Sequence, residues 1–374
     1  MQIAHIFKEY LKKIDICYTI KIRKRLRKSC NGVRYMVSMK DIAAVCGVSV
    51  ATVSKALNDH KDIGEETKVN VKKVAKEMGY SPNSVARALK TNRTYNIGVL
   101  FSDESRSGLT HNYFSHVLDS LKTTSEARGY DITFLNCNKK RKGRMSYLEH
   151  SRYRAFDGVV IACIDFDDPE VTELVNSDIP IVTIDHVFNN RIAVMSNNIK
   201  GMEDLLDYVY EKGHRRIAYI HGDDTSVTRS RLACFYKKCE EFGIEIPAGY
   251  VRMAAYRDVN AAAVETEKLL TLKERPTCIF YPDDYSSYGG MNVLRKHGIS
   301  VPDDISVVGY DGISLAKLIE PKLTTLNQNT ARIGKEAAEH LISLIEKPKS
   351  TLIEQIIVDG TLCSGNTVSD LKKV

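Results

Sequence analysis

The chain has 374 residues, of which 43% are apolar and 27% are charged, and its net charge is +7. This length suffices for two or three domains, and the composition excludes a fibrous or disordered protein. No apolar run reaches the ~18 residues of a membrane helix, and the N-terminus lacks a secretory apolar stretch. The nine cysteines are scattered and indicate neither a zinc site nor a disulfide framework. We therefore expect a cytoplasmic protein with reduced thiols, no metal and no cofactor.

The positive charge is concentrated at the N-terminal end. Residues 1–36 hold ten Lys or Arg and two acidic residues, a net of +8, whereas residues 37–95 have a net of +4 and residues 96–374 a net of −5. A basic end on an acidic body indicates a polyanionic partner at that end. The segment KIRKRLRK at 21–28 is either a nucleic-acid arm or the product of a start codon assigned upstream of Met36 or Met39, and we favour the latter.

Residues 37–59, VSMKDIAAVCGVSVATVSKALND, predict two short helices joined by a tight turn. Apolar residues recur at helical spacing in each half of the segment. Gly47 ends the first helix, and Ser49 is a favourable N-cap for the second. The pattern predicts a helix-turn-helix.

The start of the second helix is the part that such a module presents to the major groove. The candidate DNA-binding residues there are Ser49, Val50, Ala51, Thr52 and Lys55. The hydroxyls can bond phosphates, the small apolar side chains can contact a thymine methyl, and Lys55 can reach a base or a phosphate. The alternative is that Ser49 is only a cap and Lys55 only a solvated surface residue.

A third helix is predicted to follow, because Thr67, Val71, Val74 and Met78 form an apolar stripe that closes at Gly79. Residues 81–90, SPNSVARALK, predict a further short helix, and TNRTY at 91–95 predicts a linker. We therefore assign residues 37–95 to an all-α DNA-binding domain with a hinge helix.

From residue 96 onward apolar strands alternate with amphipathic helices, which predicts an α/β fold with two doubly wound parallel-sheet lobes in residues 96–374. The predicted strands are 96–101, 130–135, 156–162, 179–185, 216–222, 277–282 and 305–311. The helices between them include 112–128, 199–213, 228–242, 285–297 and 329–346. Ligands of such folds bind beyond the carboxyl ends of the strands, here between the lobes.

Enzyme chemistry is not expected. The sequence has no Walker loop, dinucleotide fingerprint, HExxH motif or GxSxG elbow. Asp283 and Asp284 are adjacent at a strand end and point to opposite sides, so they do not form the facing carboxylate pair of a glycosidase.

MKDIAAVCGVSVATVSKALND, GYSPNSVARAL, IGVLF and ISVVGYDG together resemble the LacI/GalR family of bacterial transcription regulators, over residues 39–368. The resemblance implies an N-terminal DNA reader, a hinge helix, and a periplasmic-binding-protein-like core that dimerises and binds a small sugar or nucleoside-type ligand. It places Val50, Ala51 and Lys55 at the major groove. It places Asn83 and Ala86 at the minor groove, with Leu89 as the wedge between base steps. Members usually carry arginine in place of Lys55, so phosphate affinity is expected there and a guanine fork is not.

The resemblance also places the family's ligand groups on Asp185, Arg231, Asp283, Asp284 and Asp311. These groups suit a polyol, and Phe114 or Tyr281 can cover a ring face. The alternative is that Asp283, Asp284 or Asp311 caps a helix. Gln328, in LTTLNQ at 323–328, resembles part of the last crossover between the lobes and is expected to be structural. Asp283 and Cys234 stand where many members carry asparagine and glycine.

The sequence therefore predicts a nucleoid-associated repressor of carbohydrate-utilisation genes that binds a near-palindromic operator as a homodimer, under control of a saccharide effector. Whether the effector induces or corepresses stays open. The C-terminal SGNTVSDLKKV is too short for heptads, which favours a dimer over a tetramer. Two alternatives remain: a regulator switched by a partner protein, and a sugar-binding module without a DNA role.

Overall fold

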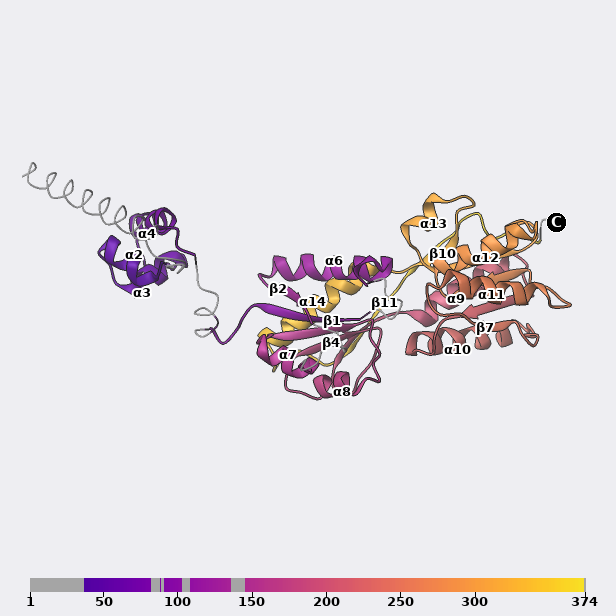
Figure 1. Cartoon of the computed structure of the whole chain (residues 1–374), viewed down its shortest axis with the longest axis horizontal. Coiled ribbons are helices and arrows are strands. Elements are labelled where there is room, and N and C mark those ends of the chain that lie inside the picture. The colour runs from indigo at the N-terminus through magenta and orange to yellow at the C-terminus, as the bar shows by residue number, and fades with distance from the viewer. Residues whose placement is uncertain (1–36, 82–87, 89–90, 103–107, 136–144, 373–374) are drawn as a thin grey trace, which may run out of the picture. The chain divides into compact units, whose positions relative to one another are not determined.

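The computed structural model describes residues 37–81, 88, 91–102, 108–135 and 145–372. Contacts divide the chain into two compact units, Met1–Asn92 and Arg93–Val374 (Figure 1). Within the described ranges, no helix combines the length and apolar character needed to cross a bilayer. The cysteines in these ranges are all free thiols.

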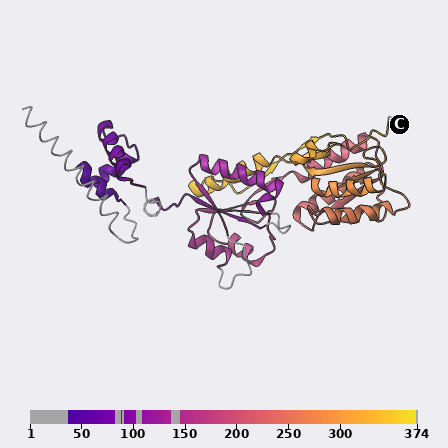
Figure 2. The ribbon, with the colours of Figure 1, turned by 45° about the horizontal axis from the view of Figure 1, so that its top comes forward.

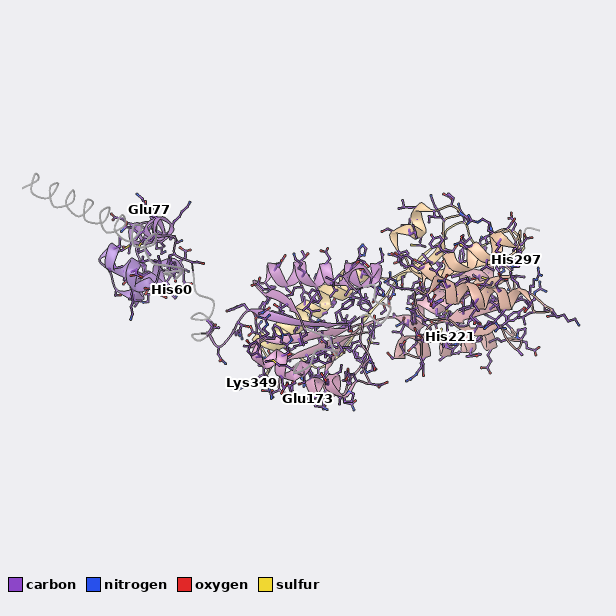
Figure 3. The ribbon with its side chains drawn as sticks, in the orientation of Figure 1. His60, Glu77, Glu173, His221, His297 and Lys349 are labelled. Carbon is purple, nitrogen blue, oxygen red and sulfur yellow. The ribbon has the colours of Figure 1, made fainter. Side chains whose placement is uncertain are left out.

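The first unit contains the three predicted helices, α2 (Met39–Cys46), α3 (Val50–Leu57) and α4 (Glu65–Met78). Gly47 and Gly79 end α2 and α4 with φ of 67°, a left-handed conformation that glycine adopts without strain. The core of the unit is formed by one face of each helix. Its buried side chains are Ile42, Ala43, Val53, Ala56, Val71, Val74, Ala75 and Met78. Polar side chains such as His60 and Glu77 remain exposed (Figure 3).

The second unit contains two six-stranded sheets, one in each lobe. The first sheet has the order β11-β5-β4-β3-β1-β2, and each neighbouring pair of strands in it is parallel. Its strands in chain order are β1 (Asn96–Phe101), β2 (Asp131–Phe134), β3 (Gly158–Ala162), β4 (Ile181–Ile184), β5 (Ile192–Ser196) and β11 (Gln355–Val358).

The second sheet has the order β12-β10-β9-β8-β6-β7 and is parallel except for β12, which runs antiparallel to β10. Its strands are β6 (Ile217–His221), β7 (Val251–Met253), β8 (Cys278–Phe280), β9 (Ser306–Asp311), β10 (Thr324–Asn327) and β12 (Thr361–Cys363). The prediction of two doubly wound parallel-sheet lobes is therefore confirmed.

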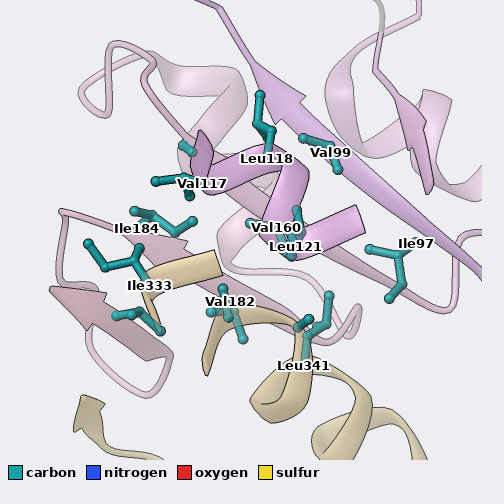
Figure 4. Packing of buried hydrophobic residues seen from close by; sticks show 14 of the residues in the cluster. Ile97, Val99, Val117, Leu118, Leu121, Val160, Val182, Ile184, Ile333 and Leu341 are labelled. Atoms are coloured by element: carbon teal, nitrogen blue, oxygen red, sulfur yellow. The ribbon is translucent and has the colours of Figure 1, made fainter. Parts of the chain in front are cut away.

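Helices cover both faces of each sheet (Figure 2). In the first lobe, α6 (Asn112–Ala127) and α14 (Thr330–Glu346) share a core with one face of the sheet, and Figure 4 shows their apolar side chains meeting the strands. On the opposite face lie α7 (Tyr147–Tyr153) and α8 (Pro169–Val175). Successive strand residues serve opposite cores, so Val159 packs with α7 and α8 whereas Val160 packs with α6 and α14.

The second lobe repeats this arrangement. Helices α9 (Asn198–Glu211) and α10 (Ser226–Glu241) form one hydrophobic core with the sheet. Helices α11 (Val259–Leu270), α12 (Asp284–Lys296) and the short α13 (Ser314–Leu318) form another. A 3-10 turn, η1 (Gly108–Thr110), precedes α6 in the first lobe.

The chain passes between the two sheets three times: from β5 to α9, from β10 to α14, and from β11 to β12. LTTLNQ was expected to form the last crossover, and this is wrong. Residues 324–327 form β10, and the last passage is at Asp359 and Gly360, because the edge strands β11 and β12 come from the final part of the chain. As a result, residues at the carboxyl ends of both sheets are connected by very short segments.

Candidate functional site

The start of α3 presents the predicted DNA-reading residues. Ser49 is the N-cap, and its Oγ accepts a hydrogen bond from the backbone N of Thr52 at 3.0 Å and lies 2.9 Å from the Thr52 hydroxyl. The structure thus gives Ser49 the capping role that the sequence left as the alternative. Val50, which is 40% exposed, and Ala51 stand on the surface beside the cap. The two side chains that are expected to make apolar contacts with DNA, Val50 and Ala51, are therefore accessible to solvent.

Lys55 is not a free surface cation. Its Nζ pairs with the carboxylate of Asp62, in the segment between α3 and α4. This bond to Lys55 holds the pKa of Asp62 below its ordinary value. Both side chains are about half exposed, and exposed pairs of this kind contribute little to stability. Lys55 can therefore exchange Asp62 for a phosphate at small cost.

The hinge residues Asn83, Ala86 and Leu89 lie outside the described residues. Their roles remain expectations from the family resemblance.

In the second unit, Asp185 directly follows β4 and has a φ of 60°. One of its carboxylate oxygens accepts from the hydroxyl of Tyr113, on α6, at 2.9 Å, and the other accepts from the backbone N of Ser196, at the end of β5, at 3.1 Å. Burial raises the pKa of Asp185, and the bonds from Ser196 and Tyr113 oppose that rise. The Ser226 hydroxyl of α10 donates to the Asp185 carbonyl at 3.0 Å, so this turn also contacts the second lobe.

Asp311 ends β9 with a φ of 105°, a conformation that a non-glycine residue rarely adopts. Its Oδ1 accepts from Nε2 of Gln328 at 2.6 Å, and the other side-chain atom of that amide, Oε1, accepts from the Ser196 hydroxyl. Burial raises the Asp311 pKa to about 7. The alternative role as a helix cap is wrong for Asp311, because α13 begins after Ile313.

Arg231 lies on α10 and is 3% exposed. Its Nε donates to Oδ1 of Asn198 at 2.8 Å and its Nη1 to the carbonyl of Pro282 at 3.1 Å, while its guanidinium carbon lies 3.4 Å from the centroid of the Tyr310 ring. Asn198 in turn donates to the Ser196 carbonyl at 3.1 Å. One hydrogen-bonded chain therefore runs from Arg231 to Asp311 by way of the crossing segments.

Asp283 and Asp284 have structural partners. Asp283 caps α12, accepting from the backbone N of Ser286 at 2.9 Å, its hydroxyl at 2.8 Å, and the backbone N of Arg257 at 2.7 Å. Asp284 accepts from the Thr325 hydroxyl at 2.6 Å and from the backbone N of Ile313 at 2.8 Å. Burial raises the pKa of both carboxyls. Both residues fit the alternative role in which they hold helix and strand ends.

The two predicted aromatic covers lie in hydrophobic cores. Tyr281 is 2% exposed, and its hydroxyl bonds the Thr266 hydroxyl at 2.8 Å, so its ring fills the interior of the second lobe; the expectation that it covers a ligand ring is wrong. Phe114 packs against Phe101 and Tyr113 at centroid distances of 5.5 and 4.8 Å within the core of the first lobe. Its neighbour Tyr113 is the aromatic that contacts Asp185.

The structure thus brings three of the predicted residues, Asp185, Arg231 and Asp311, to one place where the carboxyl ends of the two sheets meet. It adds residues that the sequence did not single out, namely Tyr113, Asn198, Ser196, Arg257 and Tyr310. Ser196 ends β5 and Asn198 starts α9, a pattern that could have indicated them, whereas Arg257 lies in a loop between β7 and α11 that carries no such signal. In the described part of the chain no three His, Cys, Asp or Glu side chains are grouped to hold a metal.

Comparisons with known proteins agree with this architecture. Residues 38–83 match the model of bacterial regulatory proteins of the lacI family, and residues 206–368 match a periplasmic binding protein-like domain. The HTH-type transcriptional repressor PurR of Vibrio parahaemolyticus is 31% identical over 87% of this chain and 99% of its own length. PurR of Pectobacterium atrosepticum is 30% identical over 90% of this chain and 98% of its own.

Solved structures show the same fold. The transcriptional regulator CelR in complex with cellobiose is 25% identical, with a TM-score of 0.64 over 88% of this chain and 99% of that one. The lac repressor dimer bound to operator and the anti-inducer ONPF is 23% identical, with a TM-score of 0.75 over 90% of this chain and 100% of that one. With its helix-turn-helix, its two-lobed core and relatives aligned along nearly their whole length, the chain belongs to the lacI family of DNA-binding transcription regulators, which are not enzymes.

Proposed function

We propose that this regulator represses transcription from a near-palindromic operator as a homodimer, and that a small effector bound between its lobes controls it. The observation that carries the proposal is the convergence of Asp185, Arg231 and Asp311 from three different elements at the carboxyl ends of both sheets. A site that takes groups from both lobes is sensitive to how the lobes are arranged, and a ligand shifts that arrangement by its difference in affinity for the two states.

The DNA-reading part of the proposal rests on α3. A single module of this size covers one half-site, so two copies related by two-fold symmetry are needed for a palindrome. The resemblance assigns the minor groove to Asn83 and Ala86 and the wedge between base steps to Leu89, which requires paired hinges. Leu89→Ala is expected to weaken operator binding strongly, whereas unchanged affinity would remove the wedge from the proposal.

The effector part rests on donor and acceptor chemistry. Carboxylates accept from adjacent hydroxyls and a guanidinium donates to ring or hydroxyl oxygens, which suits a saccharide. CelR, whose structure resembles this chain, was solved with cellobiose. The PurR relatives favour a purine as the second candidate.

Fluorescence anisotropy tests both parts. The full chain is titrated onto a labelled palindromic fragment from its own promoter region, alone and then with mono- and disaccharides and with purine bases and nucleosides. Tight, salt-sensitive binding that one compound releases or strengthens supports the proposal and gives the sign of control. Binding that no compound changes would move control to a partner protein, and absence of binding to any palindrome would overturn the repressor assignment.

A further inference from the structure

Arg257 is an arginine of the site that the roles above do not use. It lies between β7 and α11, and its backbone N donates to Asp283 at 2.7 Å. Its φ of 62° is positive, as are the φ angles of Asp185 and Asp311 in the same site. Local strain of this kind recurs at functional sites, where the surrounding structure holds it in place.

Two nitrogens of the partly buried Arg257 side chain are buried without acceptors in the described part of the chain. Its Nε and Nη1 are inaccessible to solvent and donate to no acceptor in the described part of the chain, and its carbon lies 4.8 Å from the centroid of the Tyr285 ring. The face of the Tyr285 ring attracts the positive charge of the guanidinium. It does not accept hydrogen bonds from the N–H groups, which point outward in the plane of the guanidinium. Buried donors without partners are rare in folded proteins and call for an explanation.

Two arginines, Arg231 and Arg257, share these surroundings with the carboxyls of Asp283 and Asp311. Arg231 and Arg257 both act on Asp311, where they oppose the rise in pKa that burial causes. Burial also raises the pKa of Asp283, the other carboxyl that Arg257 faces, and the oxygens of Asp283 are already bonded to Ser286 and Arg257 backbone groups. Neither carboxyl forms an ion pair with Arg257 within the described ranges, so its charge has no direct counterion there.

Arg252, a second partly buried arginine of the same lobe, provides a contrast. It lies on β7, and its Nη1 pairs with Glu265 of α11 at 3.4 Å. Arg252 therefore has a carboxylate partner that Arg257 lacks, although its Nε is likewise buried without an acceptor in the described part of the chain. The difference between the two arginines is thus the charged partner, which Arg252 has and Arg257 lacks.

We infer that the effector carries an anionic group, a phosphate or a carboxylate, and that Arg257 binds this group through Nε and Nη1. This inference rests on the effector control proposed above and specifies its chemical class. The planar fork of arginine matches two oxygens of either anion, and charge-assisted bonds of this type are among the strongest in proteins. A neutral oxygen can also accept from these donors, but only an anionic group adds the countercharge that Arg257 lacks.

The experiment compares matched ligand pairs on the full chain in a buffer without phosphate. The pairs are glucose with glucose 6-phosphate, ribose with ribose 5-phosphate, adenosine with adenosine monophosphate, and glucose with glucuronate, with inorganic phosphate as a further probe. In at least one pair the anionic member is expected to bind at least ~10-fold tighter by calorimetry. Tighter binding of the phosphorylated compounds alone would identify the group as a phosphate. Tighter binding of glucuronate as well would show that a carboxylate is also accepted.

Three variants locate the effect. Arg257→Met is expected to abolish the anionic preference while affinity for the neutral member stays within about twofold, and Arg257→Lys is expected to keep part of the preference. Because Arg257 has unpaired donors in the free protein, the melting temperature of ligand-free Arg257→Met is expected not to fall, whereas that of Arg252→Met falls. A preference that survives in Arg257→Met, or a fall in melting temperature as large as that of Arg252→Met, would overturn the inference.

Operator anisotropy with the same compounds separates this inference from the proposed function. Control by the neutral members with no gain from the anionic ones would leave effector control intact and overturn the anionic group. If no compound in either series binds the protein or changes operator binding, effector control itself fails and the inference fails with it.

Discussion

Gln328 donates a hydrogen bond to Asp311 at 2.6 Å, and the same side chain accepts from Ser196, so the passage from β10 to α14 ties the ends of both sheets together. Gln328 is 6% exposed, and its structural role matches the expectation from the sequence. Through Asn198 the connection continues to Arg231. A ligand that contacts either end of this chain of bonds acts on residues of both lobes.

Replacing Gln328 by Glu is expected to make stability depend on pH. At high pH two carboxylates would face each other at hydrogen-bond distance, whereas at low pH they can share a proton, so the pair has a raised pKa. The free energy of unfolding of Gln328→Glu should therefore fall, relative to the original chain, as pH rises from about 5 to 8. Gln328→Met, which loses both bonds without adding a second carboxylate, should cost about 1–3 kcal/mol in urea titrations and show a smaller slope than Gln328→Glu.

Asp311→Asn is expected to change the pH dependence of stability. Burial raises the Asp311 pKa in the folded chain to about 7, well above its value in the unfolded chain, which is about 3.9. The folded state therefore binds the proton between these values, and the free energy of unfolding declines as pH rises through this window. The amide keeps the bond from Gln328 but does not ionise. If the free energy of unfolding depended on pH in the same way in both proteins, the raised pKa of Asp311 in the folded chain would be refuted.

Arg231→Lys is expected to separate effector response from DNA binding. Lysine keeps the charge but cannot bond Asn198 and Pro282 at once or lie flat on Tyr310. Effector affinity should fall by about 10- to 100-fold. Operator affinity without effector should stay within about twofold, because the helix-turn-helix belongs to the other compact unit. Both constants come from one anisotropy titration series, and an unchanged response would remove Arg231 from the effector site.

Asp62→Asn is expected to strengthen operator binding by releasing Lys55 from its ion pair. Since exposed pairs contribute about 0.2–1 kcal/mol, the gain should be about 1.5- to 5-fold. If Lys55 then contacts a phosphate, the slope of log affinity against log salt should steepen by up to about 0.9. The same substitution in a Lys55→Met background is the control and should have no effect; a gain there would assign the effect to Asp62 itself.

Gly334→Ala tests how closely α6 and α14 pack. A methyl group at Gly334 would fall against the backbone oxygen of Val117, so the helices must separate. Although alanine favours a helix, we expect the substitution to destabilise the chain by about 1–3 kcal/mol. Lys335→Ala, at the next position of α14, should stay within about 0.5 kcal/mol. Equal denaturation midpoints for the two variants would contradict the close packing.

Elements with a complete local pattern could be predicted from the sequence. NIGVLF forms β1 over 96–101 as expected, because a strand buried on both faces is a continuous apolar run. The helix-turn-helix is equally local, since Gly47 and Ser49 mark its turn. The strands β5, β7, β10, β11 and β12 were not predicted. Each has only three to five residues, and the side chains of β7 and β12 are only partly buried or exposed.

The site could be predicted only in part. Asp185, Arg231 and Asp311 came from the family resemblance, and the structure brings them together. Tyr113, Tyr310 and Arg257 depend on which strand ends become neighbours, and that order is set by three crossings that no local pattern encodes. Tyr281 was misplaced for the same reason, since residues at a strand end face either the interior or the site according to their parity.

The triple crossing has a consequence for how the protein is made. The first lobe begins at β1 near residue 96, yet α14 and β11, which complete one face and one edge of its sheet, end at residues 346 and 358. Until the ribosome has passed those residues, the apolar side chains of β1, β3 and β4 that α14 covers stay open to solvent. Nascent chains stopped in the second lobe therefore expose apolar surface of an incomplete first lobe, whereas the three helices of the helix-turn-helix unit are complete by residue 78.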